Sequence, residues 1–345
     1  MPSNDVTFVE LPGIDEGNPL DAWSFDGALF VSTGARTGGT SRIFRHEDAL
    51  GDGHWVAENV PFDAETINKL RDDGDTLYAF YETPPEGQTW LTGLAKGETQ
   101  WVFESVPNIG STVGGRGLAI GPGGTRVAGA SHNWESTRDG QTYVYAGGYE
   151  ARRDIGPSLM WELEYDEFGR LWEFWNDFGG TGIPATFVAG AQASDPPGGD
   201  ISSANWFPVS EHMYTVGALA GTPTRNVINR SRHGEPWEEV HRFAEATLGD
   251  HVLFVPRNRG ELWAVGHHPL EVSWTLDGTT WTREMSIPAI STGVDTNHLT
   301  AIAFHEGRVW VFSRDDALGR IRVWQEWARN SRALRRLGRA MEGRP

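Results

Sequence analysis

Cysteine is absent from this chain of 345 residues, so disulfide bonds are excluded. Lysine is almost absent as well, because Lys69 and Lys96 are the only two among 29 basic residues. No apolar run approaches the ~18 residues that a membrane-spanning helix needs. The first residues lack the basic and apolar regions of a signal peptide. We therefore expect no membrane insertion and no export through a signal peptide.

Positive charge is scarce overall, and the formal net charge is −18 at pH 7. A surface of this sign repels phosphate groups, which argues against nucleic acid as a partner. Many acidic residues with few lysines are typical of a salt-adapted surface. A GC-rich genome gives the same preference for arginine, and the sequence leaves both explanations open. We expect a virion or cytoplasmic location, in a high-salt organism if the first explanation holds.

Glycine and tryptophan are abundant, with 43 and 16 residues. A glycine, or Glu211 in its place, precedes a short aromatic-rich strand at intervals of about 47 residues. These markers are Gly27, Gly74, Gly123, Gly169, Glu211, Gly260 and Gly307. Each unit has room for four short strands, and radial repetition of such units makes a β-propeller. The predicted fold is all-β, a seven-bladed β-propeller of four-stranded blades whose aromatic side chains fill the gaps between sheets.

The two ends of the repeat array complete each other in this prediction. The last unit offers only three strands, which lie at 299–304, 308–313 and 320–324. The segment Val6–Pro12 resembles the ends of other fourth strands, and pairing it into the last blade removes an exposed sheet edge. We therefore predict closure by the N-terminal strand and one propeller domain over 1–328. The fourth unit is irregular after Trp175, which indicates either a loop-based binding region or drift of one repeat.

The last residues, 329–345, are basic and helix-forming, unlike the rest of the chain. An apolar stripe at helical spacing predicts an amphipathic C-terminal helix. A helix this short needs a surface to pack against. We predict that it binds other protein subunits through the assembly residues Trp327, Arg332, Leu334, Arg335, Leu337 and Met341. The alternatives are packing on the acidic surface of the protein's own propeller and a solvated end without a partner.

Two segments repeat the pattern T-x-D-G-x-T-aromatic, Thr137–Tyr143 and Thr275–Trp281, with Ser231–Trp237 as a weaker copy. Asp-Gly favours a two-residue hairpin turn, since both residues tolerate a positive φ. Together with the repeat period, the pattern resembles the Asp-box (BNR-repeat) propellers of the sialidase-like superfamily, in a form shortened by one residue. The resemblance implies structural turns at the rim, away from a substrate site, at Asp139, Gly140, Asp277 and Gly278.

The catalytic features of that superfamily are missing. No Arg-Ile-Pro segment occurs, and Asp21, Glu162 and Glu164 on the expected inner strands form no convincing pair across blades. No histidine spacing of a metal site is present either, so we expect no catalytic residue, no metal and no cofactor. Weak candidates for ligand binding are Trp23, Arg36, Arg116, His132, Trp134, Trp206, His267 and His298.

These observations favour a binding or assembly module without catalysis. A structural or receptor-binding subunit of a virus particle, or of another surface assembly, fits an acidic propeller with a basic tail. Its expected partners are other subunits and a cell-surface glycan or receptor. The alternatives are a sialidase-like or other glycoside hydrolase and an intracellular propeller scaffold.

Overall fold

The computed structural model of the chain describes residues 7–15, 17–34, 41–47, 54–61, 66–83, 88–104, 117–131, 139–145, 149–157, 159–176, 185–197, 201–219, 225–243, 253–257, 260–266, 271–285, 299–315 and 319–327. The regular elements in these ranges are β-strands, apart from one 3-10 turn at Pro122–Gly124. Among the described residues, no helix is long and apolar enough to cross a membrane.

Five sheets are separate, and each contains four antiparallel strands. They are formed by β10 (Gly117–Ile120), β11 (Arg126–Ser131), β12 (Asp139–Tyr145) and β13 (Tyr149–Pro157); by β14 (Leu159–Tyr165), β15 (Leu171–Asn176), β16 (Ala185–Val188) and β17 (Ala191–Ala193); by β18 (Ile201–Phe207), β19 (His212–Leu219), β20 (Arg225–Ser231) and β21 (Glu238–Arg242); by β22 (Leu253–Arg257), β23 (Glu261–Gly266), β24 (Glu271–Thr275) and β25 (Trp281–Met285); and by β26 (Leu299–His305), β27 (Arg308–Asp315), β28 (Arg320–Trp327) and β1 (Thr7–Ile14).

The remaining strands belong to one larger sheet of eight strands. They are β2 (Asn18–Phe25), β3 (Ala28–Gly34), β4 (Ile43–Glu47), β5 (His54–Ala57), β6 (Thr66–Asp72), β7 (Thr76–Thr83), β8 (Gln88–Ala95) and β9 (Trp101–Glu104).

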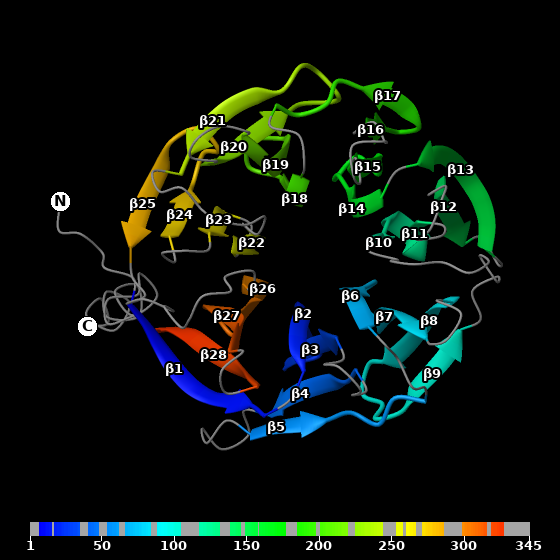
Figure 1. Ribbon diagram of the computed structural model, residues 1–345, viewed down its shortest axis with the longest axis vertical. Coiled ribbons are helices and arrows are strands. Elements are labelled where there is room, and N and C mark those ends of the chain that lie inside the picture. Colours follow the sequence, from blue (N-terminus) through cyan, green and yellow to red (C-terminus); the bar gives the residue numbers. More distant parts are fainter. Residues whose placement is uncertain are drawn as a thin grey trace, which may run out of the picture.

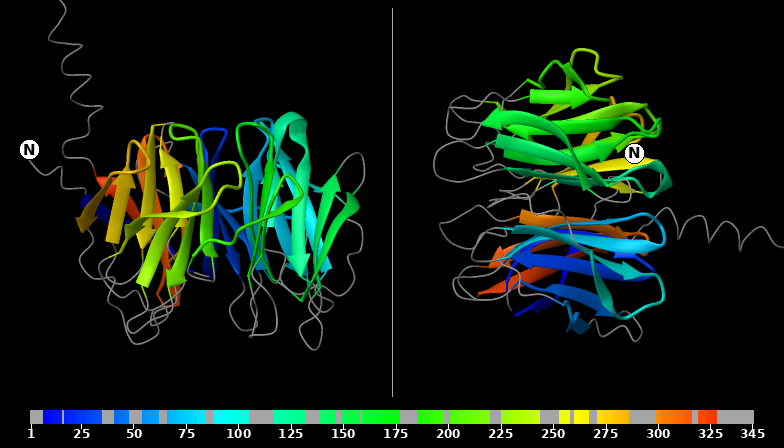
Figure 2. Two further views of the ribbon diagram at one scale, coloured as in Figure 1. Left: turned by 90° about the horizontal axis from the view of Figure 1, so that it is seen from above. Right: turned by 90° about the vertical axis from the view of Figure 1, so that its right-hand side faces the viewer.

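All of these sheets radiate from a common axis, with β2, β6, β10, β14, β18, β22 and β26 innermost (Figure 1). Each innermost strand contacts the next one around the ring, and β26 contacts β2 to close it. Figure 2 shows the strands of neighbouring sheets standing side by side along this axis. Side chains at the start of the innermost strands therefore meet near the axis, although they lie far apart in the sequence.

The prediction of seven separate blades is wrong. Five four-stranded sheets are separate, whereas β2–β9 form one continuous sheet. A single pairing joins its two halves, between Gly34 at the end of β3 and Thr66 at the start of β6. Such a pairing depends on how two strand ends meet in space, and the spacing of the repeats does not encode it.

The predicted C-terminal helix is also wrong where the structure tests it. Trp327, the first residue of the expected apolar stripe, ends strand β28 and pairs with Thr7. No α-helix occurs in the described ranges. The rest of the predicted helix, at 328–345, lies outside the described residues.

Closure by the N-terminal strand is confirmed, because β1 pairs with β28 as the outermost strand of its sheet. Phe8 of β1 is buried among residues that include Trp263 of the neighbouring sheet and Trp324 of its own. Arg322 Nε and Nη2 donate to the two carboxylate oxygens of Glu10 at 2.7 and 2.8 Å. The first strand thus fastens the end of the chain to its beginning.

Apolar side chains of neighbouring sheets pack against each other in the gaps between them. Trp310 and Phe312 of β27 share one cluster with Leu29 and Val31 of β3. Burying a large apolar side chain stabilises the fold by ~1.5–3 kcal/mol. The core is therefore divided into layers around the ring.

The Asp-Gly turn between β24 and β25 spans five residues, 276–280, and not the two that the sequence predicted. Asp277 Oδ1 accepts the backbone N–H groups of Thr280 at 2.7 Å and Thr279 at 2.8 Å. These hydrogen bonds hold the pKa of Asp277 well below its usual range. Asp139 and Gly140, in the other copy of the pattern, begin strand β12.

Replacing Gly278 in this turn should destabilise the propeller. Gly278 has a φ of 77°, and a Cβ added there would lie 1.9 Å from the Tyr214 hydroxyl oxygen. We expect Gly278→Ala to lower the free energy of unfolding by about 2–6 kcal/mol, because backbone strain and overpacking add. Gly307→Ala is the matched control, since Gly307 has a φ of 79° and no atom within 4 Å of such a Cβ. Equal losses in urea denaturation would show that the contact with Tyr214 is unimportant.

Candidate functional site

The innermost strands share an irregularity near their first residues. In β2, β6, β14, β18 and β26 the pairing register with the next strand shifts by one residue, which is a β-bulge. A bulge changes the direction of the side chains that follow it. The residues directly after the bulges are Asp21, Lys69, Glu162, Ser203 and Ala301. The three charged residues of this set meet near the axis.

Arg71 of β6 joins these charged groups. Its Nη1 atom donates to Asp21 Oδ2 at 2.8 Å and to the carbonyl oxygen of Leu70 at 2.7 Å. Its Nη2 atom lies 3.6 Å from Glu162 Oε1, and its guanidinium carbon lies 4.6 Å from the centroid of the Trp23 ring. The guanidinium group thus holds together side chains from three innermost strands.

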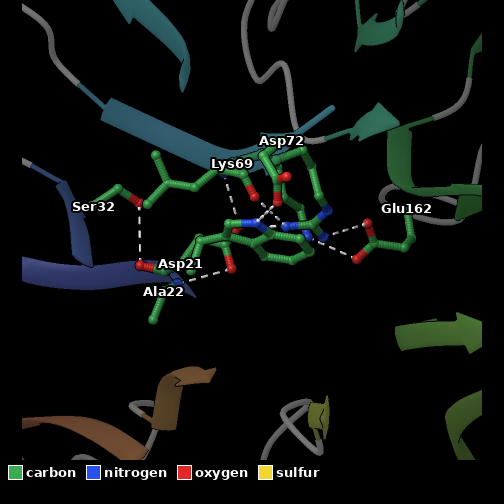
Figure 3. Close-up of polar contacts among 9 residues, drawn as sticks. Asp21, Ala22, Ser32, Lys69, Asp72 and Glu162 are labelled. Carbon is green, nitrogen blue, oxygen red and sulfur yellow. Dashed lines mark hydrogen bonds and ion pairs between the residues drawn. The ribbon is translucent and has the colours of Figure 1, made fainter. Parts of the chain in front are cut away.

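Lys69 makes a second connection across the axis. Its Nζ atom donates to Glu162 Oε2 at 2.7 Å. Lys69 belongs to β6 and Glu162 to β14, and β10 lies between these strands in the ring (Figure 1). Figure 3 shows Asp21 and Glu162 on opposite sides of the side chains that come from β6. The contact therefore links two sheets that are not neighbours.

The two remaining members are positioned by their strands. Trp23 lies two residues after Asp21 on β2, and its Nε1 atom donates to Asp72 Oδ2 at 2.5 Å. Glu164 lies two residues after Glu162 on β14, so both carboxyl groups are on the same face of that strand. We call the following set the axial cluster: Asp21, Trp23, Lys69, Arg71, Glu162 and Glu164.

Burial and charge together set the protonation of the cluster. Burial raises the pKa of Glu164 to about 7, although the positive charge of Arg71 opposes this shift. Burial by itself lowers the pKa of Arg71, but the carboxylates of Asp21, Glu162 and Glu164 outweigh it and raise that pKa overall. Arg71 therefore stays charged, whereas Glu164 exchanges its proton near neutral pH.

Glu162 is the least satisfied member of the cluster. The residue is only 4% exposed, and its Oε1 atom is buried without a hydrogen-bond partner in the described part of the chain. Arg71 Nη2 lies 3.6 Å from this oxygen, which is too far for a hydrogen bond. The cluster can therefore accept one more donor at Glu162.

The pKa of Glu164 predicts how stability changes with pH. The folded value of about 7 lies above the usual 4.5, so the folded state binds more protons between these values. The contribution of Glu164 to the free energy of unfolding is then fully present below pH 4.5. This contribution is lost as the pH rises to 7, and the loss is at most about 3 kcal/mol. We expect Glu164→Gln to raise the free energy of unfolding at pH 8 but not at pH 4.5. Glu167→Gln, on the exposed hairpin that follows, is the control. Equal effects of Glu164→Gln at both pH values in urea denaturation would contradict the raised pKa.

Of the weak binding candidates predicted from sequence, the structure brings only Trp23 into the axial cluster. Trp206 is buried in the core between sheets, where it packs with Trp172 and Met213. The other candidates lie outside the described residues: Arg36, Arg116, His132, Trp134, His267 and His298. The same holds for all assembly residues except Trp327, namely Arg332, Leu334, Arg335, Leu337 and Met341.

The sequence analysis named the cluster's carboxylates but missed Lys69 and Arg71 as their partners. A glycosidase site would need two carboxylates facing each other across blades, whereas in the structure each carboxylate pairs with a cation, Asp21 with Arg71 and Glu162 with Lys69. A usable signal was present, because Asp21, Lys69 and Glu162 occupy equivalent positions in the first strands of their units. Comparing the units position by position finds these charged residues.

Other candidate sites are weaker within the described ranges. No group of three or more histidine, aspartate or glutamate residues there is arranged to hold a metal ion. A small pocket of about 60 Å³ lies between the β2–β3 hairpin and the β8–β9 turn. Its charged groups already pair with each other, since Arg45 Nε donates to Glu58 Oε1 at 2.7 Å. The axial cluster is thus the better candidate.

Comparison with known proteins bears on the fold. No family model matches the chain, and no curated protein sequence matches it. Similar solved structures include a streptogramin B lyase, with a TM-score of 0.61, 14% identity and coverage of 94% of this chain and 98% of the other. YCF48 from Cyanidioschyzon merolae has a TM-score of 0.58 and 16% identity, and the match covers 94% of this chain and 99% of the other. The β-propeller domain of Cps50 (Swd1) from Myceliophteria thermophila has a TM-score of 0.54 and 13% identity, and the match covers 93% of this chain and 99% of the other.

The chain is a β-propeller. At identities this low, the likeness to these structures shows the fold and carries no activity over to the chain. The resemblance to Asp-box propellers gains no support from them.

Proposed function

We propose that the protein is a non-catalytic propeller that binds a small ligand at the axial cluster. The observation that carries this proposal is the buried Glu162 Oε1 atom, which has no hydrogen-bond donor among the described residues. An unpaired buried acceptor costs ~1–3 kcal/mol, so a ligand that donates a hydrogen bond to Glu162 would bind favourably there. Lys69 and Arg71 stand beside it, and their side chains are 18% and 14% exposed, so solvent reaches the cluster.

The two lysines provide the experiment. Lys69 lies in the cluster, whereas Lys96 lies on the β8–β9 turn with 59% of its side chain exposed. Isotope labelling of lysine therefore yields one reporter at the site and one internal control. We expect some members of a library of small polar metabolites to shift the Lys69 signal and leave Lys96 unchanged. A library in which no compound does so would refute the ligand site.

We also propose that this module is a structural or receptor-binding subunit of a surface assembly, such as a virus particle, and an Asp-box propeller. The Asp277 turn, with its two backbone hydrogen bonds, supports the Asp-box part. The basic segment 329–345, in a chain of net charge −18, supports attachment to an acidic neighbouring subunit. Trp327, the last described residue before this segment, pairs with Thr7 of β1.

Truncation tests the attachment. We expect a chain that ends at Ala328 to keep the melting temperature of the full chain but to lose its larger species in sedimentation velocity. Leu334→Asp should have the same effect, because a charge in place of an apolar side chain opposes burial at an interface. Unchanged sedimentation of both variants would leave the segment without a role in assembly.

An enzyme is the second candidate, and Glu164 is the observation that favours it. A carboxyl group with a pKa of about 7 beside two cations is suited to general acid–base catalysis. One similar structure is named a streptogramin B lyase. Turnover of streptogramin B or of aryl glycosides that is lost in Glu164→Gln would replace the binding proposal by this one.

A further inference from the structure

We infer that the ligand of the axial cluster is a neutral polyhydroxyl compound, a sugar or a cyclitol. This inference rests on the proposed ligand site and specifies its chemistry. Charge is the first argument. Lys69 pairs with Glu162 and Arg71 pairs with Asp21, so two cations are balanced by two carboxylates. Glu164, the third carboxyl group of the cluster, adds at most one further negative charge. An anionic ligand would face these carboxylates, and a cationic ligand would face the lysine and the arginine. A neutral molecule avoids both repulsions.

Hydrogen bonding is the second argument. Glu162 Oε1 needs a donor. Lys69 has three N–H donors, and one of them is used in the contact with Glu162. A single ligand that satisfies both residues must therefore donate and accept at neighbouring positions. Hydroxyl groups do both, and a polyhydroxyl ring carries them on adjacent carbons.

Arrangement is the third argument. Glu162 and Glu164 lie on the same face of β14, whereas the cations come from β6 across the axis. The carboxyl groups of β14 thus lie on one side of the two cations, and Asp21 of β2 lies on the other. A compact ring with hydroxyl groups around its edge reaches both sides at once. A carboxylated sugar fits less well, because its carboxylate meets the acidic groups of β14, or displaces Glu162 from Lys69.

The experiment uses the full chain with labelled lysine. The neutral probes are myo-inositol, D-glucose and D-galactose, with lactose to represent the terminal sugar of a glycan. Succinate, putrescine and N-acetylneuraminic acid are the charged probes. We expect a neutral probe to shift the Lys69 signal in a saturable way, with Lys96 unchanged. If lactose binds as tightly as D-glucose and D-galactose, the natural ligand is the terminal sugar of a glycan. If lactose binds more weakly than the free sugars, the natural ligand is a free polyol.

The outcomes separate the inference from the proposed site. A saturable shift of Lys69 by a charged probe alone keeps the axial site and overturns the inference. No shift with any probe, or with the metabolite library, overturns both. Because these measurements use the unaltered chain, they do not depend on the folding of a variant.

A variant pair adds a quantitative check. Glu162→Gln removes the charged acceptor but keeps the size of the side chain. We expect it to raise the Kd of the best neutral probe about 10-fold or more, because a hydrogen bond to a charged group is lost. Glu98→Gln, on the exposed β8–β9 turn, should leave the Kd unchanged. An unchanged Kd in a folded Glu162→Gln protein would overturn the inference.

Discussion

Arg71→Met should lower the free energy of unfolding by about 3–5 kcal/mol at pH 8, as expected when one partner of a buried ion pair is removed. Arg71 donates to Asp21 at 2.8 Å, and the variant leaves that carboxylate without its charged partner. Glu162 and Glu164 then also lose the nearest guanidinium group. Methionine keeps the apolar contact with the Trp23 ring, so the loss reports charge and hydrogen bonding. Urea denaturation with circular dichroism measures it.

The loss should be smaller at pH 5, because Glu164, whose pKa is about 7, is then protonated and no longer repels Glu162. Arg71→Lys is a graded comparison, since it keeps the charge but loses the planar donor pair. Arg242→Met is the surface control. Arg242 pairs with Glu239 at 2.8 Å on an exposed strand, and we expect no measurable change from its removal. Equal stability of Arg71→Met and the parent protein at pH 8 would mean that water already screens the cluster.

Phe8→Ala should cost about 3–5 kcal/mol, the usual loss for a buried phenylalanine. Phe8 is 6% exposed and packs with Trp263 of the neighbouring sheet, so the variant weakens both the closing strand and the contact between sheets. Val9→Ala is the matched control, because Val9 is the next residue of β1 and is 39% exposed. Similar losses for the two variants in urea denaturation would contradict the role of Phe8 in closure.

Removal of β1 altogether should have a larger effect. A chain that starts at Gly17 leaves the edge of β28 open, and exposed edges pair with other chains. We expect this chain to aggregate at concentrations where the full chain is monodisperse.

The contact of Glu10 with Arg322 adds a pH dependence, because the hydrogen bond lowers the pKa of Glu10 from 4.5. Its contribution is present above that pH and is lost as the pH falls below it.

The sequence predicted the elements of the fold better than their connection. Glycine markers and aromatic strands located most strands, and the segment at Val6–Pro12 correctly predicted the closing strand. The join between Gly34 and Thr66 was not predictable, since these residues lie in loops of two different units by sequence and meet only in space. The helix prediction failed at Trp327 because pairing with β1 outweighs helical periodicity there.

The candidate site was only partly visible in the sequence. Asp21, Glu162 and Glu164 were recognised on inner strands, but a bulge cannot be read from the residues that form it. Without the bulges, the direction of Lys69 and Arg71 toward Glu162 was unknown. The burial of Glu164 could not be predicted from the sequence either, and the raised pKa of Glu164 depends on that burial. The aromatic candidate Trp206 was misplaced because a core tryptophan and a ligand-stacking tryptophan have the same sequence signature.

The repeated bulge separates two sets of side chains. One set packs in the apolar layers between the sheets, and the other contains the charged residues of the proposed ligand site. Each bulged strand has one residue at the equivalent position directly after the bulge. Around the ring these residues are Asp21, Lys69, Glu162, Ser203 and Ala301. The five positions differ in this respect, because Ala301 belongs to an apolar layer between sheets and the Ser203 hydroxyl accepts the backbone N–H of Phe254. Substitution of Asp21, Lys69 or Glu162 can therefore change the charged groups near the axis while the apolar layers between the sheets stay the same.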